Sequence, residues 1–280
     1  MTGKHLRMQY LPHCAALFAA SVLCGVASAQ SGCSTLSDDC VAVGELDITI
    51  SLGAGTRTSP VHGNGDVPLI AIPQISWYGK RFFIESLEGG FTMYEDETHL
   101  FNLIATPGYD RVFFYRNDLQ NVFVSLSGGP IIPGDTVQRV PVSDKHTTYL
   151  AGPEWMFNFG SITGQIDALY EVTGRHGGTE LRAAFAAPLI DTRTQLMLSG
   201  GLTWKSSELV NYYYGLEGVY EPGSAVNPFV KLALMRPLTA RTAVNAFAHY
   251  EYMGESIADS PIITDPGSLT VFVGLQFKIF

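Results

Sequence analysis

Five segments of the chain alternate apolar and polar residues with a period of two, as the strands of a half-buried sheet do. In the clearest one, Leu269, Val271, Val273, Leu275, Phe277 and Ile279 alternate with Thr270, Gly274, Gln276 and Lys278. The other four are 47–54, 162–172, 180–187 and 242–252. Weaker alternation brings the predicted total to twelve strands, with the additional ranges 68–78, 81–91, 98–107, 120–128, 147–158, 194–203 and 228–236.

The connections between these strands differ in length on the two sides of the predicted sheet. If the first strand starts in the periplasm, the connections on that side are mostly short: 79–80, 108–119, 159–161, 188–193 and 237–240. Those on the other side are mostly long: 58–67, 92–97, 129–146, 173–178, 204–227 and 253–267. Short periplasmic turns and long outer loops are typical of outer-membrane barrels. The pattern predicts an all-β transmembrane antiparallel β-barrel of about 12 strands over residues 47–280.

Composition fits a membrane barrel better than a soluble β-sandwich, which also shows short alternating strands. Only 15% of residues are charged and 46% are hydrophobic, yet after the N-terminal segment no apolar run is long enough for a transmembrane helix. Aromatic residues lie near strand ends, for example Trp77 and Phe157, as interfacial girdles require. The chain ends in Phe280, the usual terminal residue and assembly signal of outer-membrane barrels.

The first 29 residues have the layout of a secretory signal peptide. Lys4 and Arg7 precede an apolar stretch, and Ala27-Ser28-Ala29 forms a small-x-small cleavage pattern, so we expect Sec-type export and cleavage after Ala29. An N-terminal membrane anchor is the competing interpretation. Cleavage removes two positive charges and no acid, so the formal net charge of −9 becomes −11. Such an acidic chain has no electrostatic reason to bind nucleic acid.

Residues 30–46 then form a predicted periplasmic N-terminal segment. It contains Cys33 and Cys40, which we expect to pair as a small disulfide loop in an oxidising compartment. No histidine lies near them, so the pattern does not indicate a metal site.

Motifs that carry known chemistry are absent from the sequence. It contains no HExxH, GxSxG, CxxC or P-loop, and its five histidines after residue 29 belong to no catalytic pattern. We therefore predict no catalytic residues, no metal and no cofactor, and a protein that is not an enzyme. A lipid-modifying enzyme of the outer membrane remains an alternative, which would need a Ser/His pair on the lipid-facing wall.

The predicted register places a set of charged residues on the inner face of the barrel. They are Glu154, Asp167, Glu171, Glu180, Arg182, Lys231, His249, Glu251 and Lys278. In the hairpin near residue 175, Arg182 is expected to lie diagonal to Asp167 and Glu171, within reach for charge pairing. These charges either neutralise one another inside a narrow barrel or line a polar pore that selects solutes.

The predicted loop 204–227 is rich in tyrosine, with Tyr212, Tyr213, Tyr214 and Tyr220. Exposed tyrosines often anchor protein contacts. These four residues could equally form the upper aromatic girdle or a folded loop over the pore mouth.

Several motifs of the chain match those of a known family, beginning with Gly53-Ala54-Gly55 and Ser59-Pro60 and continuing through Pro73-Gln74-Ile75-Ser76-Trp77-Tyr78-Gly79-Lys80-Arg81-Phe82-Phe83. With these motifs the sequence resembles the MltA-interacting protein family (MipA/OmpV). Tyr213-Tyr214-Gly215 and Ala258-Asp259-Ser260-Pro261-Ile262 resemble later motifs of the family. The chain departs from the pattern at its end, where Phe277 lies three residues before Phe280 instead of two.

This resemblance implies an outer-membrane barrel that acts as a scaffold between a murein hydrolase and a murein-synthesising penicillin-binding protein. Such a role would use the periplasmic parts, namely segment 30–46 and the turns, 108–119 above all. Other relatives are described as adhesins or porin-like proteins, so a small-solute channel and an adhesin remain alternatives.

Overall fold

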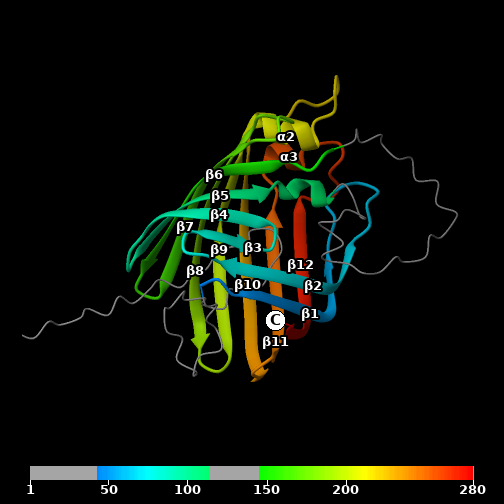
Figure 1. The fold of residues 1–280 in the computed structure, drawn as a ribbon. Helices are drawn as coiled ribbons and strands as arrows, with labels where there is room; N and C mark the ends of the chain where they lie inside the picture. Colours follow the sequence, from blue (N-terminus) through cyan, green and yellow to red (C-terminus); the bar gives the residue numbers. More distant parts are fainter. Residues whose placement is uncertain (1–42, 114–144, 280) are drawn as a thin grey trace, which may run out of the picture.

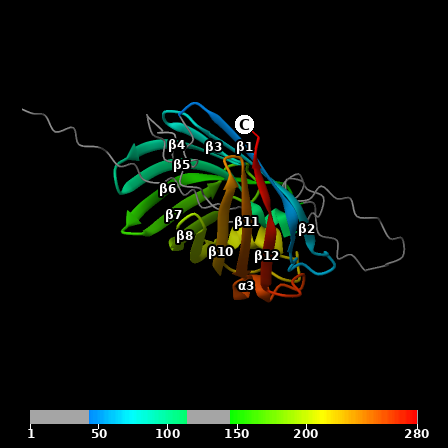
Figure 2. The ribbon, with the colours of Figure 1, turned by 90° about the horizontal axis from the view of Figure 1, so that it is seen from below.

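The computed structural model describes residues 43–113 and 145–279, which form a closed antiparallel barrel of twelve strands. Each strand pairs with its neighbours in the chain, and β1 closes the ring on β12 (Figures 1 and 2). The strands are β1 (Leu46–Arg57), β2 (Val67–Tyr78), β3 (Phe82–Glu85), β4 (Glu88–Glu95), β5 (His99–Pro107), β6 (Tyr149–Phe159), β7 (Ile162–Glu171), β8 (Thr179–Asp191), β9 (Gln195–Lys205), β10 (Ala225–Thr239), β11 (Thr242–Tyr252) and β12 (Gly267–Lys278). The predicted all-β barrel is confirmed.

Three short helical segments accompany the strands. They are the 3-10 helix η1 (Tyr109–Phe113) and the helices α2 (Ser207–Tyr214) and α3 (Glu255–Ala258), which gather at one end of the barrel in Figure 1. Within residues 43–113 and 145–279, no helix has the length and apolar character needed to cross a membrane.

Twelve strands are present, but they are not the twelve that the sequence predicts. Segment 81–91 is not one strand, because Glu85 and Glu88 pair across a two-residue turn in which Ser86 has a φ of 54°. The turn splits the segment into β3 and β4, so residues that were assigned to the loop 92–97 belong in part to β4. The predicted strand 120–128 lies outside the described residues.

The additional hairpin reverses the predicted side of two connections. The connections 79–81, 96–98, 160–161, 192–194 and 240–241 are two or three residues long and lie at one end of the barrel. The long connections lie at the other end, with η1, α2 and α3 (Figure 1). By the outer-membrane rule the short-turn end faces the periplasm. The prediction that 92–97 is an outer loop and 108–119 a periplasmic turn was therefore wrong, because residues 96–98 form a short turn and Gly108 begins a long connection.

Side-chain alternation follows the predicted faces in the long strands. In β12, Lys278 pairs with Thr49, and Gln276 donates to the hydroxyl of Thr49 inside the barrel. Gly274 and Thr270 share this inward face. Every second residue from Leu269 to Phe277 faces outward. Val273 is 57% exposed and Leu275 41% exposed, as expected for side chains that face lipid. The departure at the chain end therefore does not shift the register of the last strand.

The β4–β5 turn is held by one carboxylate. Asp96 Oδ1 accepts hydrogen bonds from the backbone N–H groups of Thr98 and His99, each at 2.8 Å, and Asp96 Oδ2 accepts one from the hydroxyl of Tyr94 at 2.8 Å. These bonds, led by that from Thr98 N–H, lower the pKa of Asp96 to about 2. A carboxyl group whose pKa is lower in the folded state than in the unfolded state contributes to folding stability, and this contribution is lost as pH falls through the folded-state pKa. At periplasmic pH Asp96 is therefore charged and holds the turn.

Candidate functional site

Every charged residue that the sequence assigns to the inner face lies on that face. Glu154, Asp167, Glu171, Glu180 and Arg182 are each less than 5% exposed. Lys231, His249 and Glu251 line β10 and β11 at inward positions, and Lys278 forms an ion pair with Asp47 at the periplasmic rim, 2.6 Å apart. Five further charged residues, which the sequence interpretation missed, join them: Arg57, Glu85, Glu88, Asp110 and Lys205.

Arg182 is the central cation of this layer. Its Nε donates to Glu180 Oε1 at 2.6 Å, and its Nη1 lies 4.0 Å from Asp167 Oδ2. Asp167 is the direct cross-strand partner of Arg182, not a diagonal neighbour, because β7 and β8 pair two positions away from the predicted register. All three side chains are buried, so each charge depends on the others for compensation.

Amides connect the acidic residues on the β5–β7 side of the lumen. Asn102 Nδ2 donates to Glu154 Oε1 at 2.7 Å. Gln165 Nε2 lies 2.8 Å from Glu154 Oε2 and 3.1 Å from each carboxylate oxygen of Asp167. The two carboxylates are therefore joined through one amide group, which orders this part of the network.

Glu171 does not pair with Arg182, contrary to the prediction. Its carboxylate accepts hydrogen bonds from the hydroxyl and backbone N–H of Thr173 and from the backbone N–H groups of Arg175, His176 and Gly177. The polar backbone of the 172–178 loop wraps around the end of β7 and supplies the donors that Arg182 was expected to supply. Glu171 therefore organises an outer loop and takes no part in the charge pairing around Arg182.

The Glu171→Leu variant is expected to open the 172–178 loop. Removing an acceptor of several hydrogen bonds lowers the free energy of opening this loop by more than about 1.4 kcal/mol, which raises the population of the open loop about tenfold. Trypsin should therefore cut after Arg175 about ten times faster. Peptide release from the refolded barrel, followed by mass spectrometry, measures this rate. Glu217→Leu, at an exposed loop position, is the control and should leave the rate unchanged. Equal rates in both variants would show that Glu171 does not hold the loop.

Asp110 joins the lumen wall to the helices at the barrel mouth. Its Oδ1 accepts from Lys205 Nζ at 2.7 Å and from the hydroxyl of Tyr214 at 2.6 Å. These three groups come from η1, β9 and α2 and are all buried. Burial, and then the carboxylate of Asp110, raise the pKa of Tyr214 well above its usual value, so its hydroxyl stays a donor.

A small polar cavity of about 50 Å³ lies between the charged layer and this junction. Its walls carry three cations and three carboxylates, namely Arg57, Arg182, Lys205, Asp110, Glu180 and Glu251. The two signs balance, so the cavity has no net charge from these six groups. A volume of this size holds a few water molecules and is far below that of a drug-sized ligand pocket.

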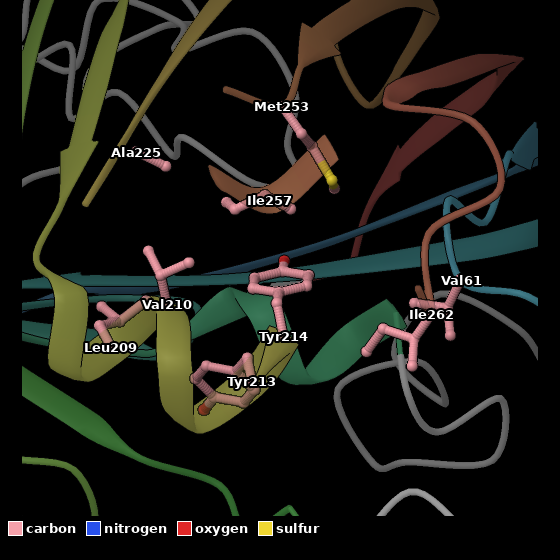
Figure 3. Close-up of a cluster of buried hydrophobic side chains, with 9 residues drawn as sticks. All are labelled: Val61, Leu209, Val210, Tyr213, Tyr214, Ala225, Met253, Ile257 and Ile262. Atoms are coloured by element: carbon pink, nitrogen blue, oxygen red, sulfur yellow. The ribbon is translucent and has the colours of Figure 1, made fainter. Parts of the chain in front are cut away.

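An apolar cap lies at the outer end of the barrel, next to the junction of Asp110 with Tyr214. Val61, Leu209, Val210, Tyr213, Tyr214, Ala225, Met253, Ile257 and Ile262 form one buried cluster, in which α2 faces α3 across the ring of Tyr214 (Figure 3). Tyr213 and Tyr214 are at most 1% exposed, Tyr212 packs against the cluster, and the hydroxyl of Tyr220 donates to Ser256 O. Of the three interpretations of these tyrosines, the structure shows the folded loop over the barrel mouth.

A second apolar layer lies in the lumen across β2, β10, β11 and β12. Its buried members are Val67, Leu69, Ile72, Ala233, Met235, Phe247 and Phe272, and the rings of Phe247 and Phe272 stack with centroids 5.9 Å apart. Lys231 Nζ lies 5.6 Å from the centre of the Phe247 ring, where the charged layer meets this apolar layer. Within the described residues, packed side chains therefore occupy this part of the lumen.

The described carboxylates and histidines show the following placement. In residues 43–113 and 145–279, no three His, Cys, Asp or Glu side chains are placed to hold a metal ion. His62 contacts Thr264, His99 contacts Trp155 and His176 accepts from Gly178 N–H, so none of these histidines pairs with a serine. The predicted signal peptide 1–29, the Cys33–Cys40 pair and Phe280 lie outside the described residues and stay predictions.

Sequence signals for the missed residues exist. Lys205 continues the inward alternation of Gly201 and Thr203, two positions beyond the predicted strand 194–203. Arg57 continues that of Gly53 and Gly55, three positions beyond the alternating segment 47–54. Glu85 and Glu88 fall in the segment that alternates poorly, and Asp110 falls in a connection. Extending each strand until its alternation ends would have identified Lys205 and Arg57.

A closed antiparallel barrel with an apolar outer wall and a filled polar lumen defines an outer-membrane β-barrel protein. The chain belongs to the family described as MltA-interacting protein MipA, whose model matches residues 50–279. The predicted family is thereby confirmed.

Known relatives agree with this class. The MltA-interacting protein of Escherichia coli (strain K12) is 22% identical over 265 residues, which cover 85% of this chain and 92% of that protein. YiaT of the same strain, named as an outer membrane protein, is 22% identical over 241 residues, covering 83% and 91%. The protein is therefore located in the outer membrane.

Two solved structures show some similarity to this chain. OmpT of Vibrio cholerae is 6% identical with a TM-score of 0.38, over 84% of this chain and 99% of that one. Neisserial surface protein A is 10% identical with a TM-score of 0.26, over 84% and 97%.

Proposed function

We propose that this protein is a closed barrel that anchors cell-wall enzymes at the periplasmic face of the outer membrane. The observation that carries the proposal is the filled lumen, in which a balanced charged layer lies between two apolar layers. A barrel without a path for solutes acts through its surfaces. The name of the relative MltA-interacting protein supports a murein hydrolase as one partner. Family resemblance suggests a penicillin-binding protein as the second.

The periplasmic end offers the docking surface for such partners. The turns at this end are short, and Glu45 and Glu97 are exposed there. The outer end instead folds its loops into the cap. Because the described turns hold few residues, we propose that segment 30–46 contributes to docking together with them.

Binding of a purified MltA-type murein hydrolase to the full-length barrel in nanodiscs tests this function. The Glu45→Lys/Glu97→Lys variant is expected to weaken binding at least tenfold, because reversed charges in a docking surface repel or mismatch the partner. Glu217→Lys/Glu221→Lys makes the same charge change at the outer end and should bind like the wild type. If the wild-type barrel forms no complex, or if only the outer variant loses binding, the proposed scaffold function is wrong.

A small-solute channel is the second candidate. The observation that favours it is the cavity with cations and carboxylates on its walls, which would attract ions or dipolar solutes if the layers above and below it opened. Electrical recording separates the two functions, because a scaffold needs no conductance and a channel requires it.

A further inference from the structure

One charged residue interrupts the apolar outer wall. Inward positions on β10 include Lys231, Ala233 and Met235, so Arg236 faces outward, opposite Val244. On the strands within residues 43–113 and 145–279, every other outward position has an uncharged side chain. A guanidinium on a lipid-facing wall costs about 2–4 kcal/mol at the bilayer midplane and almost nothing at the interface. The position of Arg236 therefore marks the headgroup layer.

A second arginine reaches the same place from the neighbouring hairpin. Met235 pairs with Gln195, which puts Arg236 level with the 192–194 turn. Arg193 in that turn is exposed, and its Nη2 donates to Leu238 O at 3.4 Å, two residues from Arg236. Both arginines thus lie at the periplasmic ends of neighbouring strands. Figure 1 shows β8, β9 and β10 side by side, ending at the short-turn end of the barrel.

The surroundings of the two arginines suit a lipid rather than a soluble anion. Leu189, Ile190 and Leu238 flank them and are 55%, 43% and 44% exposed. Asp191 is the acidic residue of this hairpin, so the charge of the group stays positive. An apolar surface beside two guanidinium groups matches a glycerophospholipid, whose phosphate carries the charge and whose acyl chains lie along the wall.

We propose that Arg193 and Arg236 form a binding site for the phosphate of an anionic glycerophospholipid in the periplasmic leaflet. Guanidinium groups present paired N–H donors that match two oxygens of one phosphate, which a lone ammonium does not do. A net positive site favours phosphatidylglycerol over lipids whose headgroup also carries an ammonium. This proposal does not rest on the scaffold function, because its ligand is a membrane lipid and not a protein partner, although Arg193 lies in one of the periplasmic turns.

Native mass spectrometry of the full-length barrel in detergent micelles, with equal added phosphatidylglycerol and phosphatidylethanolamine, tests the site. The wild type is expected to retain one phosphatidylglycerol preferentially. Arg193→Gln/Arg236→Gln should lower that retention at least tenfold. The control Lys80→Gln/Arg81→Gln removes two charges from the 79–81 turn of the same rim and should retain the lipid. Heat-modifiable migration on gels verifies that each variant is folded.

The outcomes separate a site from general attraction. Loss of phosphatidylglycerol in the Arg193/Arg236 variant alone supports the proposal. Equal loss in both double variants would show an unspecific response to rim charge and would overturn it. Equal retention of the two lipids by the wild type would overturn it as well, because Arg236 would then only extend to the interface without selecting a headgroup.

Discussion

Replacing Arg182 with methionine is expected to lower the free energy of unfolding by about 3–5 kcal/mol, the cost of leaving a buried charge without its partner. Arg182 bonds Glu180 at 2.6 Å and lies opposite Asp167, and all three side chains are at most 4% exposed. Methionine has a similar length, so lost packing is a small part of the effect. Urea unfolding of the barrel in lipid vesicles, followed by tryptophan fluorescence, measures the change.

Two variants separate lost compensation from general damage. Arg182→Met/Glu180→Gln/Asp167→Asn removes the stranded charges and should recover most of the lost stability, since neutralising both partners of a buried pair is often nearly neutral. Arg241→Met makes the same substitution at an exposed turn position and should stay within about 0.5 kcal/mol of the wild type. If the triple variant is no more stable than Arg182→Met, charge compensation is not the role of Arg182.

Much of the barrel was predictable because lipid imposes a period of two on each spanning strand. In β12, every second residue from Leu269 to Phe277 is apolar and faces outward. The outward positions of β7 and β11 follow the same alternation. This signal needs about nine residues to stand out. β3 has four residues, from Phe82 to Glu85, so its alternation cannot be separated from chance.

The turn that separates β3 from β4 also lacked a local signal. Ser86 takes a positive φ, where glycine or asparagine is the usual indication. With that turn missed, the connections 92–97 and 108–119 were assigned to the wrong sides. The prediction of twelve strands was right, although it counted 81–91 as one strand and included 120–128, which lies outside the described residues.

Cross-strand glycines are a further feature that the sequence did not reveal. The ring of Phe83 covers Gly90 so closely that a Cβ there would lie 2.1 Å from Phe83 Cζ, and the ring of Phe157 covers its partner Gly164 in the same way. Only the register shows which aromatic residue lies on which glycine. A pattern along one strand does not contain this information.

The site was predictable as a set of inward charges but not as a network. Alternation places Asp167, Glu180 and Arg182 on one face. The partner of Arg182, however, depends on the register of the β7–β8 hairpin, whose 172–178 loop is organised by Glu171. Asp110 and Lys205 are 95 positions apart, so their contact follows from barrel closure and from η1. No spacing in the sequence predicts such a pair.

The wild-type barrel is expected to give no stable conductance steps in a planar bilayer. The charged layer lies between the cap around Tyr214 and the apolar layer around Phe247 and Phe272, and we expect these two groups of packed side chains to act as separate barriers in the lumen of the described barrel. Shortening the side chains of one barrier leaves the other barrier in place. Tyr214→Ala alone and Phe247→Ala/Phe272→Ala alone should therefore also be silent, whereas the variant with all three substitutions should conduct.

Conductance through the triple variant would pass the charged layer, which gives a second measurement. Adding Lys231→Gln or Glu154→Gln should then change the preference between cations and anions in opposite directions, because fixed charge sets ion selectivity. Val273→Ala, on the outer wall, is the matched control and should change neither conductance nor selectivity. Stable steps from the wild-type barrel would contradict the closed lumen and make the solute channel the primary function. A silent, heat-modifiable triple variant would show that a further barrier fills the lumen.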